Sequence, residues 1–152
     1  MSIFPTKILL ATDGSEEATL AAQTAVDIAD KTSSELHVVY VGVLDYGYSS
    51  YDVPDYVYVQ QIQENLEQEA RKALDTEVER VKAAGGRVVE AHLSMGSPDA
   101  EIVKLADDIG AGLIVMGSRG LGGIRRALIG SVSDSVVRHA HCPVLVVREE
   151  KV

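Results

Sequence analysis

Short apolar runs alternate with segments of helical period along this chain, and that alternation limits the folds it can adopt. Runs rich in Val, Leu and Ile predict buried strands. They lie at residues 7–12, 36–41, 88–93, 113–116 and 144–147. Between them, small and apolar residues recur at helical spacing, as Ala18, Ala22, Ala25 and Ala29 do. Strands that alternate with helices form βαβ units, so the pattern predicts an α/β domain with a parallel sheet.

The ends of the predicted helices carry capping signals. Ser15 is a favourable N-cap for the first helix, and Ser97 precedes a proline at the first helical position of the third. Gly85 and Gly86 end the longest helix. The expected helices follow Ser15, span residues 60–84, run from Pro98 to near Gly110, and cover Ser131–His139.

Right-handed crossovers restrict the sheet to a few doubly wound strand orders. The Rossmann-like order 3-2-1-4-5, with helices on both faces, makes the first and fourth strands neighbours. Ligands bind such sheets where the carboxyl ends of the strands flank the switch point. Asp13 follows the first strand and Gly117 follows the fourth, so both turns are expected at the same crevice.

A glycine-rich stretch between the fourth strand and the fourth helix has the features of an anion site. It reads GSRGLGGIRRALIGSVS from Gly117 to Ser133. Glycine allows close approach of a ligand to the backbone, and the first N–H groups of a helix attract negative charge. Neither the Walker pattern nor G-x-G-x-x-G after a strand occurs in the chain. The alternative is a glycine-rich surface loop without a ligand.

The spacing G-x2-G-x9-G-S, from Gly117 to Ser131, resembles the nucleotide-binding signature of the universal stress protein family, in its ATP-binding branch. Further blocks are similar to that family in the same order, namely ILLATDGS at residues 8–15, GSP at 96–98 and HCPVLVV at 141–147. The resemblance covers nearly the whole chain. It implies one universal stress protein domain over residues 1–152, with an adenine nucleotide alpha hydrolase-like fold, that binds ATP with Mg²⁺ or Mn²⁺.

The resemblance also implies roles for individual residues. Ala11 and Thr12 would contribute backbone, Asp13 would lie beside the ribose and the metal, and Val41 and Met116 would contact adenine. Arg119 is the arginine expected to meet a phosphate, whereas Arg125 and Arg126 are expected to face solvent or act as a lid. The triphosphate would be held at Gly117, Gly120, Gly130, Ser131, Val132 and Ser133, with the two serine hydroxyls as donors. Ser131 also fits the role of a plain N-cap.

Composition excludes several other classes of protein. The chain has 152 residues, a formal charge of −9 and one cysteine. The negative charge argues against nucleic-acid binding, and neither a membrane span nor a signal peptide is expected. A single thiol fits a reducing cytoplasm. Cys142 is expected to be a buried small apolar residue, and the histidines show no metal-ligand spacing with it, so no zinc site is expected.

Two segments point to partners. Val144–Val147 would be an edge strand, and in the family this strand pairs antiparallel in a two-fold dimer. Five of the six tyrosines lie within residues 44–59, which have no clear period. That segment is expected to pack on its own domain, with a flap beside the base or a surface for an unknown protein partner as alternatives.

The sequence shows no nucleophile with an adjacent base. Together with this observation, the resemblance implies an ATP-binding regulator of the stress response and not a turnover enzyme. Slow ATP hydrolysis or self-phosphorylation at Ser131 or Ser133 remains an alternative, as does a nucleotide-free interaction module.

Overall fold

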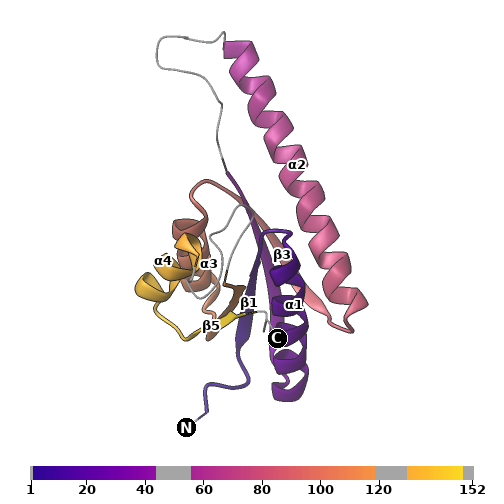
Figure 1. The fold of residues 1–152 in the computed structure, drawn as a ribbon, viewed down its shortest axis with the longest axis vertical. Helices are drawn as coiled ribbons and strands as arrows, with labels where there is room; N and C mark the ends of the chain where they lie inside the picture. Colours follow the sequence, from indigo (N-terminus) through magenta and orange to yellow (C-terminus); the bar gives the residue numbers. More distant parts are fainter. Residues whose placement is uncertain (1, 44–55, 119–129, 149–152) are drawn as a thin grey trace.

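A five-stranded parallel sheet forms the centre of the computed structural model, which describes residues 2–43, 56–118 and 130–148 (Figure 1). The strand order is β3-β2-β1-β4-β5, as the sequence predicts. The strands are β1 (Lys7–Thr12), β2 (Glu35–Gly42), β3 (Val88–Met95), β4 (Leu113–Gly117) and β5 (Val144–Val147). The described helices are α1 (Glu16–Thr32), α2 (Tyr56–Ala83), α3 (Pro98–Ile109) and α4 (Ser131–His139).

Helices cover both faces of the sheet, α1 and α2 on one face and α3 and α4 on the other (Figure 1). Ile8 and Leu10 of β1 point into the first layer, and Leu9 and Ala11 point into the second. Because both faces of β1 are covered, its sequence is continuously apolar and does not alternate. Each fully buried aliphatic side chain contributes roughly 1.5–3 kcal/mol relative to exposure.

The alanine series of α1 is buried against the sheet, as its spacing predicts. Small side chains on this face allow the helix to approach the strands closely. The Ser15 hydroxyl accepts a hydrogen bond from the Ala18 N–H at 3.3 Å, so the predicted N-cap is confirmed.

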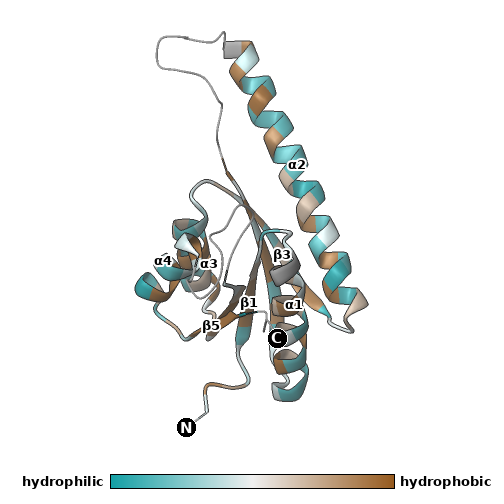
Figure 2. Ribbon diagram, in the orientation of Figure 1, coloured by the Kyte–Doolittle hydropathy of each residue, from teal (hydrophilic) through white to brown (hydrophobic). Residues whose placement is uncertain are grey.

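Helix α2 is longer at its amino end than the predicted segment at residues 60–84. It begins at Tyr56 and ends at Ala83, and its first turns extend beyond the sheet (Figure 1). Polar and apolar residues alternate around it (Figure 2), with Ala70, Leu74 and Val81 buried. Among the described residues, no helix is long and apolar enough to span a membrane.

The turn after α2 leads to a prediction. We expect Gly86→Ala to destabilise the fold by about 1–3 kcal/mol, the usual cost of overpacking. A Cβ atom at Gly86 would lie 2.6 Å from Val26 Cγ2 and 2.9 Å from Val81 Cγ1, and both valines are buried. Urea denaturation measures the loss.

The adjacent Gly85→Ala variant is the matched control. A Cβ atom there would meet nothing within 4 Å, but φ is +93°. This substitution should cost only about 1 kcal/mol, through backbone strain. Equal losses in the two variants would contradict the packing argument.

Candidate functional site

The carboxyl ends of β1 and β4 lie side by side, as expected for a switch point. Ala11 pairs with Met116 across the two strands. Asp13 follows β1 directly, and Gly117 ends β4 opposite Val147 of β5. The two turns predicted to share a crevice therefore leave the sheet at the same edge, between adjacent strands.

The glycine-rich segment is closed at its base by hydrogen bonds. The Gly130 N–H donates to the Ser118 carbonyl, and the Ser118 N–H donates to the Val147 carbonyl at 3.0 Å. Ser133 Oγ lies 3.0 Å from the carbonyl oxygens of both Ser118 and Gly130. The end of β4 and the start of α4 therefore lie next to each other. The predicted site residues Arg119 and Gly120, together with Arg125 and Arg126, lie outside the described residues.

Helix α4 begins at Ser131 and ends at His139, as predicted, but its N-cap is not Ser131. Gly130 occupies the N-cap position, so Ser131 is the first helical residue and not the cap. Ser133 is only 2% exposed, and its hydroxyl proton is shared between two carbonyls. Ser133 thus holds the base of the segment, and the contact to phosphate that the resemblance implies would require its hydroxyl to leave one of these carbonyls. Ser131 is exposed, and Val132 packs against the second core layer.

Asp13 stabilises the turn that it begins. One oxygen of its carboxylate accepts a hydrogen bond from the Ser15 N–H at 2.9 Å, an Asx-turn arrangement over Gly14. Gly14 has φ +83°, which glycine adopts without strain. The half-buried carboxylate is therefore held at the carboxyl edge of the sheet.

The residues expected at the base site lie around the same edge. Met116 is buried and Val41 is partly buried, both in the layer that contains α3 and α4. The Thr12 hydroxyl donates to Glu77 Oε2 at 2.8 Å, so the side chain is engaged by α2 and only the backbone of Thr12 is left for the role that the resemblance implies. Tyr40 pairs with Thr12 across the strands. Burial raises the pKa of its phenol, and the nearby charges of Asp13 and Glu77 raise it further.

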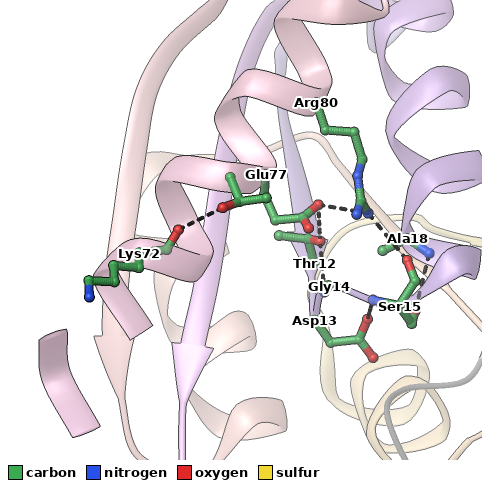
Figure 3. Close-up of polar contacts among 9 residues, drawn as sticks. Thr12, Asp13, Gly14, Ser15, Ala18, Lys72, Glu77 and Arg80 are labelled. Carbon is green, nitrogen blue, oxygen red and sulfur yellow. Dashed lines mark hydrogen bonds and ion pairs between the residues drawn. The ribbon is translucent and has the colours of Figure 1, made fainter. Parts of the chain in front are cut away.

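A buried ionic contact supports the Asp13 turn, and the sequence analysis missed it. Glu77 of α2 is 2% exposed, accepts the Thr12 hydroxyl, and lies 3.2 Å from Arg80 Nη1. Arg80 Nη1 also donates to the Ser15 carbonyl at 3.2 Å (Figure 3). Helix α2 is thereby tied to the turn that carries Asp13. The sequence does contain a signal for this contact. Glu77 lies three residues after Leu74 and four before Val81, which places its carboxylate on the apolar face of the helix.

A second contact joins α3 to α4. Asp99 accepts hydrogen bonds from Ser97 Oγ and Ser135 Oγ, each at 2.7 Å. These hydrogen bonds lower the pKa of Asp99 below its ordinary value. Ser97 precedes α3 as predicted, but its hydroxyl bonds Asp99 instead of capping the helix backbone.

From this contact we predict the effect of Ser135→Ala. Removing one donor should raise the pKa of Asp99 toward 3.8, as measured by carboxyl carbon shifts in an NMR titration. Because the folded-state pKa is depressed, the contact stabilises the fold above the unfolded pKa and loses that effect as pH falls below about 3.8. Ser97→Ala is the matched variant for the other hydroxyl. An unchanged Asp99 titration in both variants would refute the assignment.

Cys142 is only half-buried, which corrects the expectation of a buried residue, although it does pack against the second core layer. Burial raises the pKa of its thiol, so the thiol stays protonated and unreactive near neutral pH. The following strand, β5, lies at the edge of the sheet, as predicted.

Comparisons with known proteins agree with this architecture. A model of the family described as "Universal stress protein family" matches residues 5–148. A protein of Staphylococcus aureus strain USA300 assigned to that family is 43% identical over 145 residues, which are 95% of this chain and 84% of the relative.

Solved structures of the same family have the same fold. The universal stress protein UspA from Lactobacillus plantarum superposes with a TM-score of 0.80 at 30% identity, covering 97% of this chain and 100% of that one. A universal stress protein solved in complex with cAMP superposes with a TM-score of 0.68 at 28% identity, covering 96% and 98%. With a family model matching nearly its full length and relatives above 40% identity, the chain belongs to the universal stress protein family.

Proposed function

We propose that this chain binds ATP, with Mg²⁺ or Mn²⁺, at the carboxyl edge of β1 and β4, and acts as a nucleotide-dependent regulator of the stress response. One observation supports the proposal above the others. The hydrogen bonds of Ser118 and Ser133 bring the start and end of the glycine-rich segment together beside the Asp13 turn.

The phosphates would lie against the backbone between Gly117 and the first turn of α4. The N–H groups at the start of a helix have no intrahelical acceptors, and the helix dipole favours an anion there. Ser131 and Val132 supply such N–H groups, and the exposed Ser131 hydroxyl adds a donor. Arg119 and Gly120, which lie outside the described residues, would complete the contacts to the triphosphate.

The metal and the base would be held on the opposite side of the crevice. Asp13 provides a carboxylate, and carboxylate with phosphate oxygens is the ligand set that Mg²⁺ prefers, so the residue fits the ion. Adenine would pack between Val41 and Met116 and form hydrogen bonds with nearby main-chain groups. The related protein in complex with cAMP carries an adenine nucleotide, which supports a ligand of this class.

The role that we propose is regulation and not turnover. Ser133 shares its proton with two carbonyls, which argues against it as a phosphoacceptor. A bound nucleotide would instead fix the segment between β4 and α4 in one state, and it can shift that equilibrium only through different affinities for the two states.

A homodimer is part of this proposal. Strand β5 lies at an edge of the sheet and its residues are partly exposed. An open edge can pair with another chain, and two-fold symmetry would place two copies of Val144–Val147 antiparallel.

The nucleotide carried by the purified protein tests the proposal. The protein is denatured and the released small molecules are identified by mass, and Mg-ATP is added to a second sample in a thermal shift assay. ATP without multiple turnover is the expected result. ADP or AMP with repeated turnover would indicate an enzyme. No nucleotide and no thermal shift would contradict the proposal and favour an interaction module.

A further inference from the structure

Two neighbouring strands carry the same short pattern, Glu-x-His. It occurs at Glu35 and His37 in β2 and again at Glu90 and His92 in β3. Residues two apart in a strand point to the same face of a sheet. The register places His37 opposite Glu90 and Val39 opposite His92. The fold therefore gathers two imidazoles and two carboxylates on one face of the sheet, near its β3 edge.

The spacing of these groups fits a metal ion. His37 Nδ1 lies 3.2 Å from His92 Nε2, and the rings stack with centroids 5.5 Å apart. Two nitrogens bound tetrahedrally to zinc, each at about 2.0–2.1 Å from the ion, lie about 3.3 Å from each other. His92 Nε2 is 3.8 Å from Glu90 Oε2, and single ligand atoms of His37, His92 and Glu90 all lie within 4.8 Å of one another. From this geometry we propose that His37, His92 and Glu90 bind a divalent transition-metal ion of the zinc class.

Glu35 acts on this site through His37. Its Oε2 lies 3.4 Å from His37 Nε2, the ring nitrogen that faces away from His92. A proton held on Nε2 by this carboxylate leaves the lone pair of Nδ1 directed at the site. Metal-binding histidines commonly have such a carboxylate partner, which fixes the tautomer and the ring orientation. Glu35 is therefore a positioning residue.

Two of the proposed ligands are held inside the protein, and the third is open to solvent, from which the ion would enter. The His37 side chain is 4% exposed and that of His92 is 14% exposed, whereas that of Glu90 is 62% exposed. Glu90 can thus turn to complete the ligand set without repacking the core. Three protein ligands leave a fourth tetrahedral position for water. The bound ion would join the edge strand β3 to β2.

The proposed site is separate from the nucleotide site. His37 pairs with Leu9 in the first half of both strands, whereas the nucleotide crevice lies where β1 and β4 end. The expectation of no zinc site considered the histidines only with Cys142. It overlooked that parallel pairing of two distant Glu-x-His patterns brings their side chains together.

Zinc binding to the full-length, tag-free protein tests the proposal. Metal is first removed with a chelator, and Zn²⁺ is then titrated in competition with a chromophoric chelator. We expect one equivalent per chain in the wild type. Glu35→Gln should weaken binding by about 10–100-fold, the usual effect of losing an outer carboxylate, and His92→Gln should weaken it at least as much.

His141→Gln is the matched control. His141 is exposed and pairs with Asp107 at 2.9 Å, so it offers a histidine and a carboxylate at a different place. The affinity of the His141→Gln variant for zinc should equal that of the wild type. Co²⁺ provides a second readout, because tetrahedral coordination gives a visible absorption band that should disappear in His92→Gln.

Three results would overturn the proposal. One is no zinc binding by the wild type, which would leave the two imidazoles as a hydrogen-bonded pair. Another is equal affinity in His92→Gln and His141→Gln, which would indicate scattered surface carboxylates. The third is an equal loss of zinc affinity in Glu90→Gln, His92→Gln and His141→Gln. If these variants also lose their far-UV circular dichroism signal, the loss of affinity is an effect on folding. Retained Mg-ATP thermal shifts in His92→Gln would show that this site is independent of the proposed nucleotide site.

Discussion

Replacing Gly130 with valine is expected to lower the affinity for Mg-ATP by about 100-fold or more. Gly130 is buried and donates its N–H to the Ser118 carbonyl at the base of the glycine-rich segment. A branched side chain must be accommodated at this buried position, and a shift of the backbone to make room for it would move the first turn of α4. Losing two charge-assisted hydrogen bonds to phosphate, each contributing about 1.5–3 kcal/mol, gives a change of this size. Isothermal titration calorimetry measures it.

A glycine just before the amino end of β4 provides the control. Gly110 ends α3 with φ +72°, and a Cβ atom there would meet nothing within 4 Å. Gly110→Ala should cost about 1 kcal/mol of stability through backbone strain and leave ATP affinity unchanged. Ser131→Ala, which removes one exposed hydroxyl, should reduce the affinity by about 10-fold. Unchanged affinity in Gly130→Val, with the fold intact, would show that the phosphates bind elsewhere.

Arg80→Ala is expected to destabilise the protein by about 3 kcal/mol, the lower end of the range for breaking a buried ion pair. The Glu77 carboxylate is 2% exposed and would remain buried without its cation. We place the loss at the lower end because 27% of the Arg80 side chain is exposed. Urea unfolding measures the change. Because Arg80 also holds the Ser15 carbonyl, the Asp13 turn should loosen and ATP affinity should fall several-fold.

Two variants show whether the burial of Glu77 is the cause. Lys82 pairs with Glu79 on the exposed face of the same helix at 3.6 Å, and Lys82→Ala should change stability by less than about 0.5 kcal/mol. Glu77→Gln removes the charge but keeps an acceptor for the Thr12 hydroxyl. In that background Arg80→Ala should cost only about 1 kcal/mol. A full loss in the Glu77→Gln background would mean that Arg80 acts through packing or its hydrogen bond to the Ser15 carbonyl, and not through the charge of Glu77.

Periodicity predicted the elements because burial on both faces leaves a strong signal. The continuous apolar run of β1 indicates a strand covered on both faces, and the alanine face of α1 indicates a helix packed closely on the sheet. The handedness of βαβ units left a few doubly wound strand orders, of which 3-2-1-4-5 makes the first and fourth strands neighbours. The start of α2 was missed because residues 44–59 contain Gly47 and Pro54 and show no period, yet the helix begins two residues after that proline.

The features that the sequence did not reveal depend on contacts between distant segments. Glu77 meets Thr12 across 65 positions, and His37 meets His92 across 55. No local rule links such residues; only the sheet register and helix packing bring them together. The sequence predicts the bounds of α4, Ser131–His139, correctly, but Ser131 also fits the role of its N-cap because serine is a favourable capping residue. In the structure Gly130 takes that position, and its N–H donates to the Ser118 carbonyl.

An NMR titration of ¹⁵N-labelled protein with Mg-ATP tests the central claim most directly, because it reports where on the chain the nucleotide binds. The predicted result is saturable amide shifts, largest at Gly130, Ser131, Val132 and Asp13, with little change at Glu90 and His92. Shifts that cluster elsewhere on the sheet, or no saturable shifts at all, would contradict a phosphate site between β4 and α4.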